Sequence, residues 1–413
     1  MIRLSLRKKK RDDFVLAIDI GSYKTCAVLA RLTDDGYEIV NFSQCISKGI
    51  KKGNLIDKEA VLSSINTLIQ GFHINEDTGI ILSVPSIYTA PLTKDISIPI
   101  KKQQVSGGHI SRLMETAFNS ETNIDREIIH VIPIFFYVDE DSPVKNPLNL
   151  KGDILGMKAF MIVAEAHKGF DKLKYVCERS GMAVTFFILS LISSSVSTLT
   201  NEEKDRGALL LDIGGGKTEI GIFKEGRLRF FSSLPIGGNH FTNDLSIGLG
   251  LPFNECERIK KIYSEVYLSP QQESLIEALS YDGRIKTVTS SEVFSIINPR
   301  AEELFLIIKR EIQKNFLDEP LLCVVLTGGC ANMSGICSLA QEIFDIPVRI
   351  GTPSMLLGEK KGIVSGLPED FSELVKPEFS SVLGTAVFGL QLLTDGHFKN
   401  KKFRMQWLKN IFN

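Results

Sequence analysis

Apolar residues in the first part of the chain fall into short runs separated by turn residues and one helical stretch. Residues 14–20 read FVLAIDI and end at Gly21 and Ser22, which favour a tight turn. Between residues 58 and 72 the apolar side chains recur three and four positions apart, as they do on one face of a helix. The predicted strands are 14–20, 25–30, 37–45 and 80–84, and the predicted helix is 58–72.

The rest of the chain continues as a mixture of apolar runs and segments with helical spacing. A proline at 299 lies inside the longest helical segment, and its missing N–H and its ring predict a kink or a division there. The further predicted strands are 128–138, 158–164, 208–213, 219–223 and 321–326, and the further predicted helices are 111–118, 168–179, 240–247, 253–266, 291–314 and 380–393.

One short pattern occurs twice, at a wide separation. Residues 18–22 read IDIGS, and residues 211–215 read LDIGG. Each copy consists of a strand, an aspartate, a turn of small residues and a second strand. Two half-molecules built on this plan would face each other across a cleft.

The repeated pattern contains the residue types that hold nucleotide phosphates. Glycine lets backbone N–H groups approach a phosphate, and a nearby lysine or threonine adds a charge or a hydroxyl. An aspartate at each strand end suits the waters around Mg²⁺, which prefers oxygen ligands. We therefore expect two phosphate hairpins and a T-G-G sequence near the adenosine, with both aspartates holding Mg²⁺ through water. The candidate residues are Asp19, Gly21, Ser22 and Lys24 in the first hairpin, Asp212, Gly214, Gly215, Gly216 and Thr218 in the second, and Gly328 and Gly329 near the adenosine.

A simpler interpretation exists for each copy alone. A single D-x-G sequence is more often an ordinary β-turn, because Asp and Gly are the usual turn residues. Two copies at half-molecule spacing, together with the sequence T-G-G at 327–329 after a third strand, favour nucleotide binding instead. The chain contains neither G-x-x-x-x-G-K-[ST] nor G-x-G-x-x-G after a strand, so neither a P-loop nor a Rossmann site competes.

Length and composition limit the class of protein. A chain of 413 residues is too long for one compact core and predicts two or more domains. Its 48 basic and 49 acidic residues give a net charge of −1, which argues against electrostatic binding of nucleic acid. The seven cysteines include no C-x-x-C pair, which favours reduced thiols over a zinc site. The basic stretch 7–11 lacks the apolar segment of a secretory signal, so we expect a cytoplasmic protein. The stretch either adds to membrane attraction or, as we favour, belongs to a solvated N-terminal extension at 1–13.

The C-terminal segment has a different pattern. Residues 398–413 read FKNKKFRMQWLKNIFN, with five basic residues, no acidic residue and the only tryptophan of the chain. On a helix most of the apolar residues gather on one arc, although Arg404 breaks this arc and Lys401 also falls within it. The pattern predicts an amphipathic helix lying on an anionic membrane. The alternative is a last helix packed on the body of the protein. The expected membrane contacts are Phe403, Trp407, Leu408, Ile411, Phe412, Lys401, Lys402, Arg404 and Lys409.

Several of these segments resemble a known superfamily. IDIGSYKTCAVLA resembles the first phosphate motif of the actin, Hsp70 and sugar-kinase superfamily, LLLDIGGGKTEIGIF the second, and TGGCANMSGI the adenosine motif. Segments 130–159, 190–207 and 234–252 are similar to the FtsA family of bacterial cell-division proteins. The second motif reads GGGK where GGGT is usual, so Lys217 either contacts phosphate or points outward.

The resemblance implies an α/β fold of the actin-like ATPase type. Two facing RNase H-like domains would surround a nucleotide cleft, with an FtsA-type inserted subdomain. The implied units are subdomain 1A at 14–83 and 165–206, the inserted subdomain 1C at 84–164, subdomain 2A at 207–242 and 316–375, subdomain 2B at 243–315, a helix returning to 1A at 376–395, and a linker with the membrane helix at 396–413.

The resemblance also implies a function. The protein would bind ATP and Mg²⁺, form actin-like filaments on the cytoplasmic membrane at the septum, and tether the FtsZ ring through subdomain 2B. Subdomain 1C would contact other division proteins. Lys260 matches a position that approaches the nucleoside, and Ser193 aligns with the residue that orients the attacking water. Because a serine hydroxyl is a poor base, we expect ATP to bind firmly and turn over slowly.

Two other functions remain open on the sequence. A PilM-like adaptor of type IV pilus assembly would share the fold and the inserted subdomain, but the basic amphipathic tail favours the FtsA type. A sugar or acid kinase would need a catalytic aspartate facing a second substrate, and the sequence identifies none.

Overall fold

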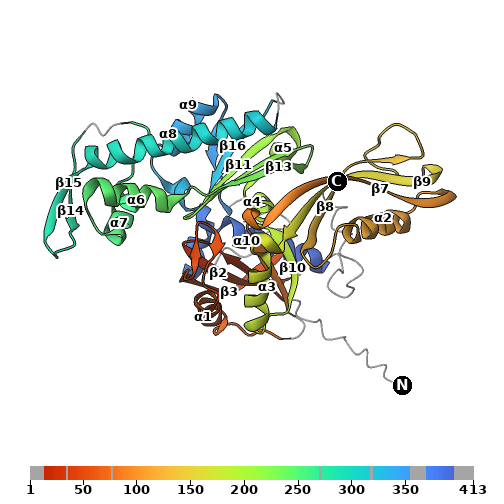
Figure 1. The fold of residues 1–413 in the computed structure, drawn as a ribbon, viewed down its shortest axis with the longest axis horizontal. Helices are drawn as coiled ribbons and strands as arrows, with labels where there is room; N and C mark the ends of the chain where they lie inside the picture. The colour runs from red at the N-terminus through yellow and green to blue at the C-terminus, as the bar shows by residue number, and fades with distance from the viewer. Residues whose placement is uncertain are drawn as a thin grey trace, which may run out of the picture.

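The computed structural model describes residues 14–33, 36–75, 78–268, 272–316, 320–353 and 369–394. Two five-stranded sheets in this part of the chain form the centre of the molecule (Figure 1). Their strand orders are β10-β6-β1-β2-β3 and β13-β12-β11-β16-β17. The first sheet contains β1 (Phe14–Ile20), β2 (Lys24–Leu32), β3 (Tyr37–Ile46), β6 (Gly79–Val84) and β10 (Val184–Leu189), and the second contains β11 (Ala208–Ile213), β12 (Thr218–Lys224), β13 (Arg227–Leu234), β16 (Cys323–Thr327) and β17 (Val348–Ile350).

The two sheets repeat one arrangement of three strands. In the first sheet β1 pairs with β2 antiparallel and with β6 parallel, and in the second β11 pairs with β12 antiparallel and with β16 parallel. Asp19 lies opposite Cys26 of β2, and Asp212 lies opposite Glu219 of β12. The two halves predicted from the repeated sequence therefore share one plan, with an aspartate at the same place in each.

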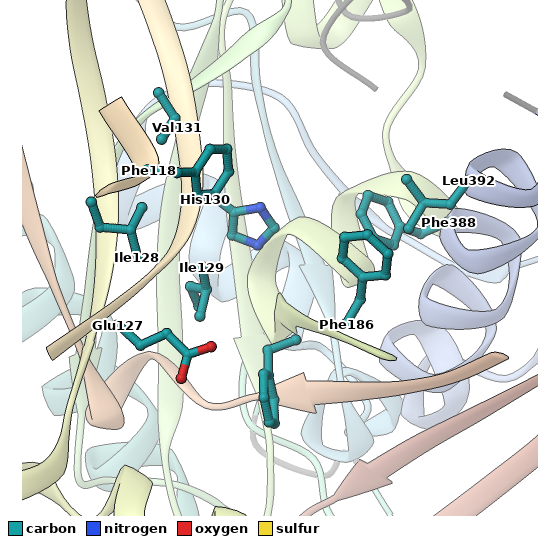
Figure 2. Close-up of a pocket in the computed structure, with 10 residues that line it drawn as sticks. Phe118, Glu127, Ile128, Ile129, His130, Val131, Phe186, Phe388 and Leu392 are labelled. Carbon is teal, nitrogen blue, oxygen red and sulfur yellow. The ribbon is translucent and has the colours of Figure 1, made fainter. Parts of the chain in front are cut away.

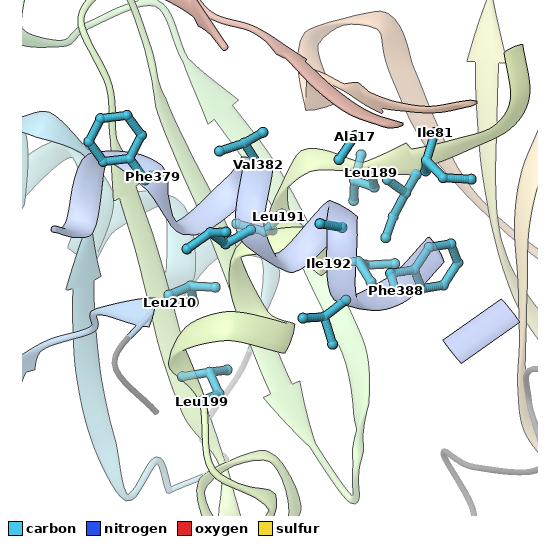
Figure 3. Close-up of a cluster of buried hydrophobic side chains, with 14 of the residues drawn as sticks. Ala17, Ile81, Leu189, Leu191, Ile192, Leu199, Leu210, Phe379, Val382 and Phe388 are labelled. Carbon is cyan, nitrogen blue, oxygen red and sulfur yellow. The ribbon is translucent and has the colours of Figure 1, made fainter. Parts of the chain in front are cut away.

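Two helices pack against each other between the sheets. They are α4 (Ser190–Thr198) and α10 (Ser380–Thr394), and Figure 3 shows α10 surrounded by apolar side chains from both sheets. Gly384 of α10 permits the close approach, because a Cβ there would overlap the carbonyl group of Ser193. The C-terminal helix is thus built into the centre of the molecule. The other helices near the sheets are α1 (Lys58–Ile69), α3 (Phe170–Arg179), α5 (Asn201–Arg206) and α9 (Ile336–Phe344).

A three-stranded sheet with its own apolar core is inserted between β6 and β10 and lies at one end of the molecule (Figure 1). It is joined to the second large sheet by Arg227 of β13. The buried Arg227 guanidinium donates hydrogen bonds from Nη1 to the backbone oxygens of Pro133 and Ile134, the latter at 2.5 Å. The elements of this insert are β7 (Thr89–Gln104), α2 (Gly107–Asn119), β8 (Arg126–Val138) and β9 (Lys151–Glu165).

A helical unit with a β-hairpin lies at the opposite end of the molecule (Figure 1). One face of the hairpin packs inward through Ile276 and Val288, while Leu275, Leu279 and Ile285 are exposed. This unit contains α6 (Gly238–Leu249), α7 (Phe253–Tyr263), β14 (Leu275–Leu279), β15 (Ile285–Thr289) and α8 (Ser290–Asn315).

Several elements of the structure were not predicted from the sequence, among them β7, β10, β13, β17, α4, α5, α9 and the hairpin β14–β15. The hairpin β14–β15 was not predicted, because its outward positions are apolar and hide the usual alternation of a surface strand. Pro299 does not divide the long helix, since α8 is continuous from Ser290 to Asn315, with the buried residues Ile297 and Ala301 holding both sides of the proline. None of the helices among the described residues is long and apolar enough to cross a membrane.

A buried histidine links the insert to the first large sheet. His130 of β8 lies among the apolar side chains drawn in Figure 2, and its Nε2 accepts a hydrogen bond of 3.0 Å from the backbone N–H of Leu189. Burial lowers the pKa of His130 to about 3, well below its ordinary value of 6.5. The imidazole is therefore neutral in the folded protein at every physiological pH.

This histidine predicts a specific pH dependence of stability. Below pH 6.5 His130 binds a proton in the unfolded chain but not in the folded chain. His130 therefore lowers the free energy of unfolding as the pH falls toward 3. Between pH 7 and pH 5 the loss should be about 2 kcal/mol. Urea denaturation should show that the free energy of unfolding depends less on pH in His130→Gln than in the parent chain, by this amount. The same substitution at the exposed His73 should leave the pH dependence unchanged, and an equal effect of both substitutions would contradict the prediction.

Candidate functional site

The two strand–turn–strand hairpins and the T-G-G turn meet at one cavity of about 600 Å³. This volume lies within the range of small-molecule and cofactor sites. Of the sequence-predicted site residues, those that line the cavity are Asp19, Gly21, Ser22, Lys24, Asp212, Gly214, Gly215, Gly216, Lys217, Lys260, Gly328 and Gly329.

The two hairpin turns have the same backbone geometry. The Gly21 N–H donates to the backbone oxygen of Lys24 at 3.0 Å, and the Gly214 N–H donates to the backbone oxygen of Lys217 at 3.0 Å. Each bond closes a turn between the two strands of its hairpin and leaves the intervening residues at the edge of the cavity. Local sequence thus determines both turns, and the matching strand arrangement of the two separate sheets gives the turns equivalent positions.

Glycines allow the two turns to lie directly against each other. A Cβ at Gly216 would lie 2.5 Å from the Ser22 hydroxyl oxygen, and a Cβ at Gly215 would lie 2.8 Å from the Cβ of Tyr23. These distances are shorter than real Cβ contacts. The absence of side chains at these positions is therefore a packing requirement as well as a means of exposing N–H groups.

Two partly buried aspartates stand at the ends of the central strands. The Ser381 hydroxyl donates to Asp19 Oδ1 at 2.9 Å, and the Ser194 hydroxyl donates to Asp212 Oδ2 at 2.7 Å. Burial raises the pKa of Asp19, and burial together with the nearby charge of Glu219 raises the pKa of Asp212 to about 7. Carboxylates in this situation are stabilised by a cation, so the pair fits a hydrated Mg²⁺. Among the described residues, no three His, Cys, Asp or Glu side chains are placed to ligate a metal directly.

Glu219 is a cavity residue that the sequence-based reasoning missed. Its carboxylate accepts hydrogen bonds from the backbone N–H of Ser86 at 2.6 Å and from the Ser190 hydroxyl at 2.7 Å, and it pairs with Lys217 Nζ at 2.5 Å. Burial raises the pKa of Glu219, but the Lys217 charge and these hydrogen bonds outweigh burial and hold it below the ordinary value. The sequence did contain a signal for Glu219. It lies two residues after Lys217, and residues two apart on an extended chain share one face.

The lysines of the cavity have separate partners. Lys24 Nζ lies 3.1 Å from the centroid of the Phe379 ring, and burial lowers the pKa of Lys24. Lys260 Nζ donates to the backbone oxygen of Gly238 at 3.0 Å and pairs with Glu257 at 2.7 Å. Lys217 does not point outward, because it is turned toward Glu219 and only 11% of its side chain is exposed.

The T-G-G turn closes the cavity beside the second aspartate. Gly328 has φ +83° and ψ 172°, a combination available to glycine, and a Cβ there would lie 2.5 Å from Asp212 Oδ1. Thr327 fixes the turn from beneath, since its hydroxyl group lies 2.7 Å from that of Ser380. Segments before α10 complete this side of the cavity. Lining residues that the sequence analysis did not predict include Asn332, Met333, Glu373, Lys376, Glu378, Phe379 and Ser381.

Two predicted site residues lie outside the cavity. Ser193 is fully buried, and its hydroxyl oxygen accepts a hydrogen bond of 2.8 Å from Thr385 of α10. Thr218 is also buried, and its hydroxyl donates to the backbone oxygen of Ile236 at 2.8 Å. Ser190 at the start of α4 lines the cavity, whereas Ser193 lies three residues deeper in the helix and is bonded to Thr385 of α10. The predicted membrane residues between 401 and 412 lie outside the described residues.

Comparison with protein families gives two matches along the chain. The model of Cell division protein FtsA matches residues 209–384, which include the second hairpin, the T-G-G turn and the beginning of α10. The model of the SHS2 domain inserted in FTSA matches residues 88–163, which cover β7, α2, β8 and most of β9.

Solved structures with the same fold come from several bacterial systems. The chain matches a protein of the PilM–PilN type IV pilus biogenesis complex with a TM-score of 0.64 and 14% identity, covering 91% of this chain and 98% of that one. It matches MreB5 of Spiroplasma citri bound to AMPPNP with a TM-score of 0.52 and 13% identity, covering 94% of this chain and 99% of that one. These likenesses confirm the predicted actin-like fold.

Relatives with substantial sequence identity extend along most of the chain. The Cell division protein FtsA of Borreliella burgdorferi is 32% identical over 387 residues, covering 91% of each chain. The Cell division protein FtsA of Escherichia coli K12 is 27% identical over 420 residues, covering 97% of this chain and 95% of the relative. Together with the two family matches, this identity over the whole fold shows that the chain belongs to the FtsA family of cell-division proteins.

Proposed function

We propose that this chain binds ATP with Mg²⁺ in the central cavity and acts at the inner face of the membrane as a filament-forming tether for the FtsZ ring. The observation that carries the ATP part is the meeting of two equivalent phosphate-type hairpins and the T-G-G turn at one cavity. The fold neighbour MreB5 is bound to AMPPNP, which supports the proposal that a protein of this fold binds a nucleotide. Membership of the FtsA family supports a role at the division septum.

Different residues of the cavity would bind different parts of the nucleotide. The exposed N–H groups of the two glycine turns would bind the phosphates, and Lys24 would add positive charge. Asp19 and Asp212 would hold waters of a bound Mg²⁺, which supplies neutralisation of the phosphate charge. Gly328, Gly329 and Lys260 would face the adenosine side of the ligand.

The arrangement favours slow turnover of ATP. Activation of a water needs a base with a free acceptor, and Ser193 lies away from the cavity. Glu219 reaches the cavity, but it already accepts from Lys217, Ser86 and Ser190, and those partners keep it a weak base. ATP would therefore act chiefly as a ligand that stabilises one relative arrangement of the two halves.

The peripheral units are assigned to partners. We assign the FtsZ tail to subdomain 2B at 243–315, where the outward hairpin residues Leu275, Leu279 and Ile285 offer exposed apolar surface. Other division proteins are assigned to the inserted subdomain at 84–164. Self-association into filaments would place copies of the chain side by side, so that many membrane helices act together. The other boundaries of the subdomains are proposed as in the sequence analysis.

The C-terminal segment 396–413 is proposed as the membrane anchor. The test is co-sedimentation of FtsZ with vesicles rich in anionic lipid, in the presence of ATP and Mg²⁺. The full chain should carry FtsZ into the pellet, and a truncation ending at Asp395 should leave both proteins in the supernatant. The reason is that the truncation removes an apolar face and five basic residues, each basic residue contributing about 1 kcal/mol near an anionic surface.

Controls separate the anchor from the FtsZ contact. Vesicles of uncharged lipid should bind the full chain less, because they offer no anionic headgroups to the basic residues of 396–413. A chain that pellets without FtsZ would contradict the tether while leaving the anchor intact. If full and truncated chains both stay soluble and neither binds FtsZ, the tether is wrong and a PilM-like adaptor becomes the better proposal.

A further inference from the structure

Lys217 places a positive charge among the buried and partly buried carboxylates of the cavity. Asp19, Asp212 and Glu219 all line the cavity together with Lys217, and we refer to these three acids as the acidic cluster. The Lys217 ammonium contacts Glu219 directly, and Lys217 lines the same cavity as both aspartates. The lysine thus places its charge against one member of the acidic cluster and in the same cavity as the other two.

The position of this ammonium is fixed by packing. A Cβ at Gly53, between β4 (Ile50–Lys51) and β5 (Asn54–Leu55), would lie 2.9 Å from Lys217 Cδ, so the lysine stem runs beneath this small hairpin. Glu219 is held in turn by Ser86 and Ser190 of the first half of the molecule. Lys217 belongs to the second half, and its charge is therefore anchored where the two halves meet.

The charge balance of the cavity indicates what this lysine does. Three carboxylates in a buried site repel one another, and removing each from water is costly unless a cation compensates. A bound nucleotide adds further negative charge to the same site. A divalent ion supplies one form of compensation, and a lysine ammonium is a compact charge that supplies part of it from within the chain.

We propose that Lys217 serves as an internal counter-cation of the acidic cluster, so that nucleotide binding depends less on Mg²⁺ than it would with threonine at this position. Threonine is the residue of the usual GGGT motif and would provide a hydroxyl without charge. The inference rests on the proposed binding of ATP in this cavity. It concerns how much of the positive charge that compensates the acidic cluster comes from the protein itself and how much from Mg²⁺.

The test compares the dissociation constant of a fluorescent ATP analogue in EDTA with that in excess Mg²⁺, using the full-length chain. The quantity of interest is the ratio of the two constants, which we term the Mg²⁺ ratio. Lys217→Thr should raise the Mg²⁺ ratio about tenfold over the parent chain, a coupling of ~1.4 kcal/mol between the lysine and the ion. Lys217→Arg, which keeps the charge, should stay close to the parent ratio.

A matched control uses Lys261, another lysine that lines the cavity. Lys261 Nζ pairs with Glu257 at 3.6 Å and bonds the Tyr23 hydroxyl at 2.6 Å, with no contact to the acidic cluster. Lys261→Thr removes the same charge from the cavity and should leave the Mg²⁺ ratio unchanged. An equal rise in both lysine variants would overturn the specific role of Lys217.

Two further variants keep the inference falsifiable if Lys217→Thr does not fold. Glu219→Gln lowers the negative charge of the acidic cluster and should reduce the Mg²⁺ ratio below that of the parent. The double variant Lys217→Thr/Glu219→Gln has the same net charge as the parent site and should restore the parent ratio. A ratio that does not move in either direction would refute the inference. Failure of the parent chain to bind the analogue at all would instead refute the proposed ATP binding.

Discussion

Replacing Gly328 with alanine is expected to weaken ATP binding by about 100-fold or more, equivalent to at least ~2.7 kcal/mol. An alanine would have to adopt φ +83° and ψ 172°, which is costly for any residue with a Cβ. The added carbon would also lie 2.5 Å from Asp212 Oδ1 and 2.7 Å from the backbone oxygen of Ile213. Relief of these contacts must displace either the T-G-G turn or the aspartate, and both belong to the cavity.

The adjacent glycine is a matched control for this prediction. A Cβ at Gly329 would find only the Glu378 Cβ within reach, at 4.0 Å, so Gly329→Ala should fold and should weaken ATP binding much less than Gly328→Ala does. Isothermal titration with ATP and Mg²⁺ should separate the two variants, with circular dichroism confirming that each is folded. Equal affinities for Gly328→Ala and the parent would show that the turn does not shape the nucleotide site.

Gly384→Ala is expected to destabilise the protein by about 3 kcal/mol or more, or to prevent folding. The new methyl group would overlap the Ser193 carbonyl oxygen and lie 2.5 Å from its carbon, where α10 crosses α4. The obstacle is backbone in the centre of the molecule, so no side-chain rotation can relieve it. The helices must move apart and leave gaps in the apolar core that surrounds them.

Thermal and urea denaturation measure this effect, and Gly107→Ala is the comparison. Gly107 begins α2 and has nothing within 4 Å of its Cβ position, so alanine there should be neutral or slightly stabilising. Equal melting temperatures of the Gly384→Ala and Gly107→Ala variants would mean that α4 and α10 are not packed as described.

Local sequence was sufficient to predict the features that depend on local geometry. The strands around Asp19 and Asp212 are continuous apolar runs that end in glycine, and a strand followed by a glycine turn needs little tertiary information. Their repetition indicated two halves and a shared cleft. Most of the predicted nucleotide residues line one cavity for this reason.

Features that depend on the packing of distant segments were not predictable in this way. The direction of Ser193 is determined by α10, which follows it by almost two hundred residues, and the sequence near Ser193 contains no sign of this neighbour. Glu219 reads as an ordinary polar residue of a strand until Ser86 and Ser190 are brought against it. The continuity of α8 through Pro299 likewise results from burial on both sides of the proline.

The bonds of the insert to both halves of the molecule have a consequence for how binding at the insert and binding at the cavity affect each other. His130 ties the insert to Leu189 of β10 in the first sheet, and Arg227 ties it to the second sheet. A rotation of one half against the other cannot preserve both ties unless the insert itself deforms. With a nucleotide bound in the cavity as proposed, a partner that holds the insert in one conformation would shift the affinity of the cavity for that nucleotide. Thermodynamic reciprocity then requires the nucleotide to shift the affinity for the partner by the same factor.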